Sequence, residues 1–177
     1  MKEDFKSKYL PEFVYGGIDG SITTFAVVAG VMGASLGSTI VLILGFANLF
    51  ADGFSMAVSN YLSMKSGVEL KRHRKSNFST DGKSPMKTGL VTFSSFFLVG
   101  LIPLIPFVLA TFIPLIQKYQ FSLSITLTGF AFFGVGAIKG RIIQKHFIKS
   151  AVETVLIGGI AAIIAFLVGY FIKFLIG

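Results

Sequence analysis

The sequence predicts an all-α integral membrane protein with five transmembrane helices, its N-terminus inside and its C-terminus outside. The first observation is composition: 53% of the 177 residues are hydrophobic and the mean hydropathy is +0.79, too apolar for an ordinary soluble domain. The second is that the apolar residues form five runs, each near the roughly 20 residues that cross a bilayer. These runs cover about residues 13–34, 38–64, 89–116, 121–138 and 151–176. We expect them to form a single membrane domain over residues 1–177.

The third observation is the distribution of the net charge of +8. The basic residues of the second-to-third and fourth-to-fifth connections are Lys65, Lys71, Arg72, Arg74, Lys75, Lys83, Lys87, Lys139, Arg141, Lys145 and Lys149. On the opposite side of the predicted membrane, the basic residues are only Lys118 and Lys173. This bias is typical of cytoplasmic connections and sets the predicted orientation. Nucleic acid is not an expected partner, because no stripe of base-reading aromatic residues lies on a soluble face. With no cysteines, the chain has no thiolate metal site.

The first run carries an acidic residue in an otherwise apolar segment. On a helical wheel, Asp19 shares a face with Thr23, Ala26, Gly30 and Gly33. Small residues let helix backbones approach closely, so this face is expected to pack against another helix and to contribute to a dimer interface. The alternative is that Asp19 caps the start of the helix. The preceding residues 1–12 form either a short interfacial amphipathic helix or a solvated tail.

The second run carries a polar stripe. At about 100° per residue, its members fall within an arc of roughly 140°: Asn48, Asp52, Ser55, Met56, Ser59, Asn60 and Ser63. An aspartate at membrane depth costs about 2.5–3.5 kcal/mol on insertion scales, so such a residue is a functional-site candidate. At about 1.5 Å per residue, Asp19 and Met56 lie on the order of 9 and 12 Å from their cytoplasmic helix ends. The stripe and Asp19 are therefore expected to meet at similar depth.

The remaining segments carry fewer signals. Residues 65–88 are predicted to form a basic cytoplasmic loop. The third run contains prolines at positions 103, 106 and 114, which either break a helix along a pathway or adjust its packing. Near the inner end of the fifth run, Glu153 either pairs with Lys149 four residues earlier or serves in gating or proton transfer.

The side chains of the stripe suit a cation. Carboxylate and amide oxygens bind hard divalent ions, and a thioether shifts the preference toward softer transition metals. A bound metal displaces protons from buried carboxylates, so a site of this kind can exchange metal for protons. We predict Asp19, Asp52 and Met56 as metal-ligating residues, with the pathway lined by Asn48, Thr23, Ser59 and Asn60. Two other classes stay open: an intramembrane enzyme with an Asp19–Asp52 acid–base dyad, and a structural or signalling protein.

Three stretches resemble the vacuolar iron transporter family: YGGIDGSITTFAVVAGVMGA, NLFADGFSMAVSNYLSMKS and ETVLIGGIAA. The resemblance covers nearly the whole chain. It implies a homodimer of five-span protomers that moves Fe²⁺, and often Mn²⁺, out of the cytoplasm in exchange for H⁺, without a permanently bound cofactor. Because Asp19 and Met56 lie in the matching motifs, the resemblance implies that both belong to the metal pathway. Asp52 matches an acid found in part of the family, and Asn48 stands where other members carry an acid.

One departure concerns the connection between the second and third runs. Many plant-type members of the family insert a Glu- and Met-rich metal-binding domain there, whereas this chain has a short basic loop. A basic loop repels divalent cations, so no cytoplasmic carboxylate cluster is expected. Mn²⁺ therefore stays an alternative to Fe²⁺, or the chain is selective for another divalent cation. The membrane is either the cell membrane or that of a storage compartment.

Overall fold

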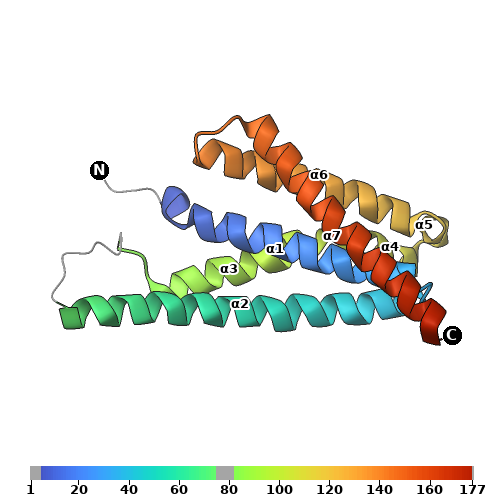
Figure 1. The fold of residues 1–177 in the computed structure, drawn as a ribbon, viewed down its shortest axis with the longest axis horizontal. Helices are drawn as coiled ribbons and strands as arrows, with labels where there is room; N and C mark the ends of the chain where they lie inside the picture. Colours follow the sequence, from blue (N-terminus) through green and yellow to red (C-terminus); the bar gives the residue numbers. More distant parts are fainter. Residues whose placement is uncertain (1–4, 75–81, 177) are drawn as a thin grey trace.

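The protein is a multi-pass helical membrane protein. A computed structural model describes residues 5–74 and 82–176, with side chains for residues 8–70 and 82–176. The helices are α1 (Phe5–Gly33), α2 (Ser38–Arg74), α3 (Pro85–Gly100), the 3₁₀ turn η1 (Ile102–Leu104), α4 (Ile105–Phe112), α5 (Pro114–Gln117), α6 (Gln120–Ile142) and α7 (Phe147–Ile176) (Figure 1). Within the described residues, five helical stretches are long and apolar enough to cross a membrane, which confirms the predicted fold class. These stretches are Lys8–Gly33, Ser38–Leu70, Pro85–Phe112, Gln120–Ile142 and Phe147–Ile176.

The helix ends differ from those that the apolar runs suggested. Helix α1 already begins at Phe5, so residues 5–12 are helical rather than a solvated tail. Helix α2 continues to Arg74, well into the predicted 65–88 loop, because Leu, Glu, Lys and Arg are good helix formers even where they are not apolar. Residues 75–81 of that loop lie outside the described residues. Helix α3 then starts at Pro85, a position where the missing N–H of proline costs no hydrogen bond.

The third membrane-crossing stretch is broken by its prolines. Helix α3 ends at Gly100, and the chain passes through η1 before α4 begins at Ile105. The Ser124 hydroxyl of α6 donates a 2.7 Å hydrogen bond to the carbonyl of Pro103, which lies in the interrupted segment. Leu104 is fully buried in the core. The helix break, which was one of the two predicted effects of the prolines, is therefore present. The broken segment packs in the protein interior.

The core lies where α1, α2, α3 and the proline break meet. Its fully buried apolar side chains include Val28, Leu49, Phe96, Leu104 and Phe107, which come from five successive elements. By contrast, α7 exposes most of its side chains, as expected for a helix that faces lipid along much of its length. The core thus holds α1 against α2 and α3, and this packing positions the polar residues of α1 and α2.

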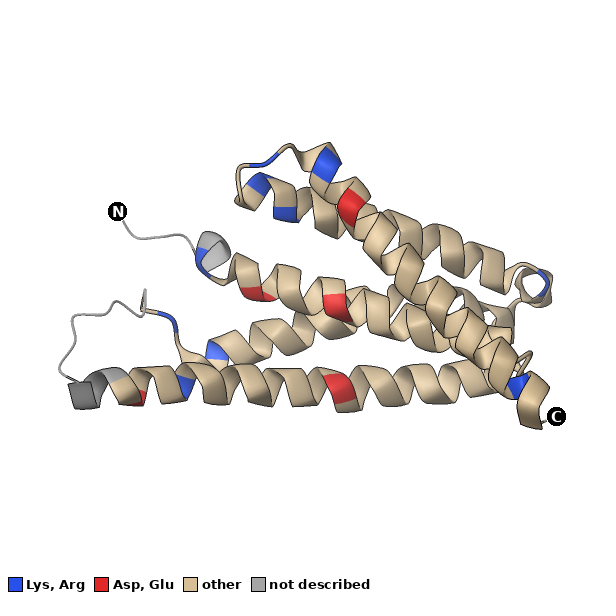
Figure 2. Ribbon diagram, in the orientation of Figure 1, with Lys and Arg blue, Asp and Glu red and all other residues tan. Residues whose placement is uncertain are grey.

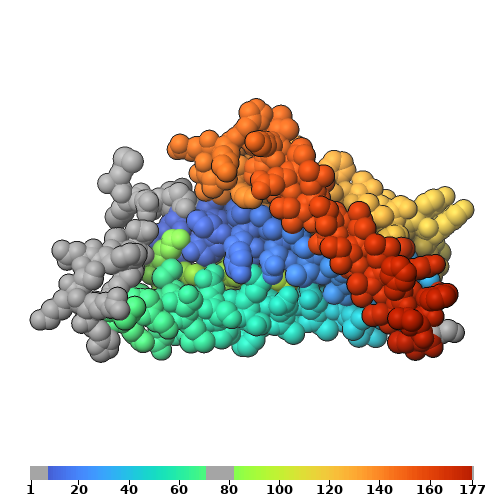
Figure 3. Space-filling model, viewed as in Figure 1, coloured from blue at the N-terminus to red at the C-terminus, as the bar shows by residue number. Residues whose placement is uncertain are grey.

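Helix α7 crosses α1 at a close contact between small residues. Figure 3 shows α7 lying diagonally over the molecule. A Cβ on Gly33 would collide with the carbonyl of Phe166, and Gly169 lies directly against the backbone of Gly30. The small-residue face of the first span therefore does pack against another helix. That helix belongs to the same chain, so α7 packs against Gly30 and Gly33, while the use of the span-one face in a dimer interface stays a prediction.

Basic positions gather at one end of the molecule. Figure 2 shows most of the described Lys and Arg near the α2–α3 and α6–α7 connections, with isolated basic positions near α5 and the end of α7. The start of α1 lies at the same end as the α2–α3 connection, and the end of α7 lies at the opposite end (Figure 1). This asymmetry is the one on which the predicted orientation rests.

Candidate functional site

The two aspartates predicted for the metal site lie on facing helices. Asp19 is on α1 and Asp52 on α2, and both side chains are partly buried. Helices α1 and α2 lie side by side at this level, where Asn48 of α2 bonds to Thr23 of α1. Since α1 begins at Phe5, Asp19 lies in mid-helix, and the alternative that it caps the helix start is wrong. Carboxylate oxygens on two neighbouring helices are ligands that suit a divalent cation.

A hydrogen-bonded link joins α1 to α2 next to this pair. The Asn48 amide donates to the hydroxyl oxygens of Thr23, at 3.4 Å, and of Thr24, at 3.2 Å. The Thr23 hydroxyl in turn donates a 2.8 Å hydrogen bond to the main-chain carbonyl of Asp19. Polar bonds of this kind hold membrane helices together. Asn48 and Thr23 therefore fix the spacing of the two helices beside the aspartates.

A polar groove runs along α2, beginning within one helical turn after Asp52. It has a volume of about 450 Å³ and is lined by Tyr15, Ser55, Met56, Ser59, Asn60 and Ser63. Met56 lies one helical turn from Asp52 and also packs against the apolar core, so its thioether bridges groove and interior. The structure thus brings Met56, Ser59 and Asn60 to one surface, beginning one turn from Asp52.

Asn60 also has a packing role. Its amide donates a 2.7 Å hydrogen bond to the hydroxyl of Thr92 on α3, and Thr92 donates to the carbonyl of Thr88 at 3.0 Å. Asn60 therefore lines the groove and ties α2 to α3.

Glu153 lies apart from these residues. Its side chain on α7 is 57% exposed and pairs at 3.9 Å with Lys139 of α6, across the helix hairpin, instead of with the predicted Lys149. It does not line the polar groove. The structure therefore does not join Glu153 to the Asp19–Asp52 pair.

Sequence reasoning missed a second buried acid on α1. Glu12 is 8% exposed; its Oε1 accepts from the Lys83 ammonium at 2.9 Å, whereas its Oε2 has no partner within the described part of the chain. The available signal was its spacing: Glu12 precedes Asp19 by seven residues, or about two helical turns, on the same face. Tyr15, which lines the groove, was also missed.

The described residues of one chain hold no cluster of three or more His, Cys, Asp or Glu side chains that could bind a metal ion. Further candidate ligands among the described residues are therefore of other kinds than His, Cys, Asp and Glu. Within this chain, the groove offers a thioether, hydroxyl groups and an amide for that purpose.

The fold and site define an integral membrane protein with a paired acidic centre next to a polar groove. The chain belongs to the VIT family: a model of that family matches residues 10–79 and 68–170. It is similar to the vacuolar iron transporter of Toxoplasma gondii, with 28% identity over 97% of this chain and 76% of the relative. It is also similar to the vacuolar iron transporters of Plasmodium berghei (26%, over 93% and 82%) and Centaurea cyanus (29%, over 88% and 84%).

The comparisons also bear on the α2–α3 connection. The two segments matched by the family model meet at residues 68–79, at this connection. The alignment to the Toxoplasma gondii protein runs over 231 positions, more than the 177 residues of this chain, so the relative has additional residues within the aligned region. Both findings are consistent with a shortened α2–α3 connection in this member of the family.

Proposed function

We propose that this protein moves a divalent transition metal ion, Fe²⁺ or Mn²⁺, across the membrane in exchange for protons. The observation that carries the proposal is that Asp19 and Asp52 lie on adjacent, hydrogen-bonded helices, with Met56 one turn from Asp52 at the end of a polar groove. Membership of the VIT family and the names of the relatives point to a transporter rather than an enzyme, so the Asp-dyad enzyme is not pursued. The metal is cargo, and no resident cofactor is invoked.

In this proposal, each residue has a defined role. Asp19 and Asp52 ligate the metal and take up protons when it leaves, because metal and protons compete for the same carboxylate oxygens. Met56 adds a soft ligand that favours a transition metal over Ca²⁺ or Mg²⁺. The link through Asn48 and Thr23 keeps the two aspartates at a fixed spacing. Ser59 and Asn60 line the route to the site, and Glu153 is assigned no direct role.

We further propose that a homodimer completes the site. Among its described residues, one chain offers two carboxylates to the site, whereas divalent metals take four to six or more ligands. The groove is open along the exposed side of α2, where Ser55, Ser59 and Ser63 face outward. A second copy seated there by two-fold symmetry would bring a second set of ligands and cover polar groups that are otherwise exposed to lipid.

The proposed direction of transport follows from the charge distribution. From Met56 to Ser63, the groove extends toward the end of the molecule that carries most of the lysines. If that end is cytoplasmic, as the positive-inside bias predicts, metal enters the groove from the cytoplasm and leaves on the other side. Inward-directed protons would then drive metal out of the cytoplasm.

Metal uptake into proteoliposomes tests the proposal. Fe²⁺ and Mn²⁺ are supplied separately, with and without a pH gradient, to the unmodified chain, Asp19→Asn and Met56→Ala. Glu69→Gln is the matched control for Asp19→Asn, because Glu69 is an exposed acid on α2 outside the groove. We expect gradient-driven uptake that Asp19→Asn abolishes, Met56→Ala weakens and Glu69→Gln leaves unchanged. Equal uptake by all four proteins would contradict the assignment of the site, and the ratio of the two metals gives the selectivity.

A further inference from the structure

Two apolar grooves flank α3 on the outside of the molecule. The α2–α3 groove has a volume of about 310 Å³, and its walls include Phe54, Val58, Tyr61, Met86, Leu90 and Phe93. The α1–α3 groove has a volume of about 450 Å³, and its walls include Tyr9, Leu10, Phe13, Leu90, Val91 and Leu98. Leu90 lines both grooves and is 54% exposed, so its side chain forms a ridge that separates the two grooves.

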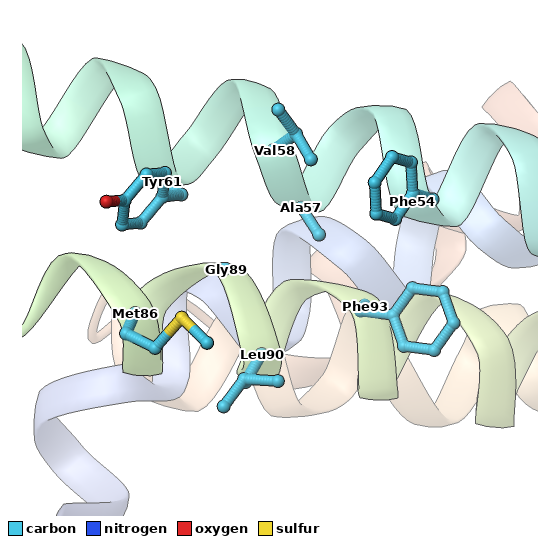
Figure 4. Close-up of a pocket in the computed structure, with 8 residues that line it drawn as sticks. All are labelled: Phe54, Ala57, Val58, Tyr61, Met86, Gly89, Leu90 and Phe93. Atoms are coloured by element: carbon cyan, nitrogen blue, oxygen red, sulfur yellow. The ribbon is translucent and has the colours of Figure 1, made fainter.

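The α2–α3 groove has a defined floor and two different ends. At its floor, a Cβ on Gly89 would lie 2.8 Å from the carbonyl oxygen of Ala57, so α2 and α3 approach too closely there for a side chain. Figure 4 shows Phe54 and Phe93 at one end, and Tyr61 and Met86 at the other. The walls are almost purely apolar, and the tyrosine marks the end nearest the α2–α3 connection. Tyrosine is enriched where a membrane protein meets the headgroup region.

Positive charge lies at that same end. Lys65 follows Tyr61 by one helical turn, on the face of α2 that carries Phe54 and Val58, and it is exposed. On α3, Lys87 precedes Val91 by one turn, on the face that lines the α1–α3 groove. Each groove therefore has a lysine one turn beyond its lining residues. The acid on the same stretch of α2, Glu69, lies one turn farther from the groove than Lys65.

We propose that this surface binds one anionic phospholipid, with an acyl chain in each groove and the headgroup phosphate at the end of the grooves that carries Lys65 and Lys87. Two apolar channels separated by a single side-chain ridge fit two hydrocarbon chains joined at one end. Charge complementarity selects the headgroup, because each lysine near a membrane surface favours an anionic lipid by about fivefold. The site is independent of the proposed transport function and lies on another face of α2.

Lipid retention by the unmodified fold provides the first test. The protein is purified in detergent, incubated with equal amounts of phosphatidylglycerol and phosphatidylcholine, and examined by native mass spectrometry. We expect one phosphatidylglycerol per chain to be retained preferentially, and Lys65→Gln to lower this preference about fivefold. Lys173→Gln, at the opposite end of the molecule, is the matched control and keeps it. Equal retention of both lipids by the unmodified chain, or no difference between the two variants, would overturn the proposal.

A fluorescence measurement locates the lipid. The chain contains no tryptophan, so a single Leu90→Trp substitution on the ridge provides the sole indole reporter. In bilayers with a small fraction of brominated phosphatidylglycerol, we expect its quenching to exceed the level set by the bulk lipid ratio. Ile164→Trp, on the exposed surface of α7, is the control and should report the bulk ratio. Bulk-level quenching at both positions would place the lipid elsewhere and contradict the site.

Discussion

Removing Lys83 tests the structural role of the buried acid Glu12. The Lys83→Met variant leaves the Glu12 carboxylate without its 2.9 Å partner, in a site where the side chains of Lys83 and Glu12 are only 17% and 10% exposed. Breaking a buried ion pair in this way costs about 3–5 kcal/mol, because the remaining charge stays desolvated. Since Glu12 Oε2 already lacks a partner within the described residues, other hydrogen bonds do not offset the loss. For a chain of this size, a cost near the lower limit lowers the melting temperature by on the order of 10 °C.

The matched control is the other ion pair. In Lys139–Glu153 the side chains are 30% and 57% exposed and 3.9 Å apart, so Lys139→Met should cost about 0–1 kcal/mol. Melting is followed by circular dichroism in one detergent at neutral pH for both variants. The double variant Glu12→Leu/Lys83→Met should recover much of the lost stability, because it removes both charges. If Lys83→Met and Lys139→Met melt within 2 °C of each other, by this order-of-magnitude scale, the buried pair does not have the role inferred here.

Two further predictions use the same melting assay. Gly33→Ala places a methyl group against the carbonyl of Phe166 and should cost about 1–3 kcal/mol, whereas Gly37→Ala, which meets open space, should melt like the unmodified chain. Ser124→Ala leaves the Pro103 carbonyl without its side-chain donor and should cost about 1–3 kcal/mol. The control Thr126→Ala removes an exposed hydroxyl bonded within its own helix and should cost about 0.5 kcal/mol or less. Equal losses within either pair would contradict the corresponding contact.

The fold class was accessible from sequence because hydropathy reports directly on burial in lipid. Five apolar runs gave five membrane-crossing stretches within the described residues. The helix ends were not accessible, because a helix continues into water wherever its residues favour helix, as α2 does to Arg74. Helix periodicity also indicated the polar faces of the first two runs, and in the structure α1 and α2 are adjacent and joined by Asn48 and Thr23. The role of Asp19 and Asp52 in metal exchange stays a prediction.

It was harder to predict which helix packs against a given helix face than to predict the face itself. The small residues Gly30 and Gly33 showed that some backbone approaches α1 closely, but nothing in their spacing identified α7 as that neighbour. Glu12 was missed for a related reason. It precedes the apolar run, so its local sequence resembles a polar tail, and its burial depends on Lys83, which lies 71 residues away in sequence. The spacing of Glu12 from Asp19 indicated its face, but a partner 71 residues away is set by tertiary packing and leaves no local pattern.

The most direct test of the central claim is a simultaneous record of metal and proton movement in proteoliposomes. Metal entry is followed by an indicator inside the vesicle, and internal pH by a second dye, for the unmodified chain and Asp19→Asn. We expect that metal moving one way is matched by protons moving the other way, and that Asp19→Asn loses both fluxes together. If metal crosses without any change in internal pH, or if Asp19→Asn retains both fluxes, the carboxylate pair is not the site of exchange.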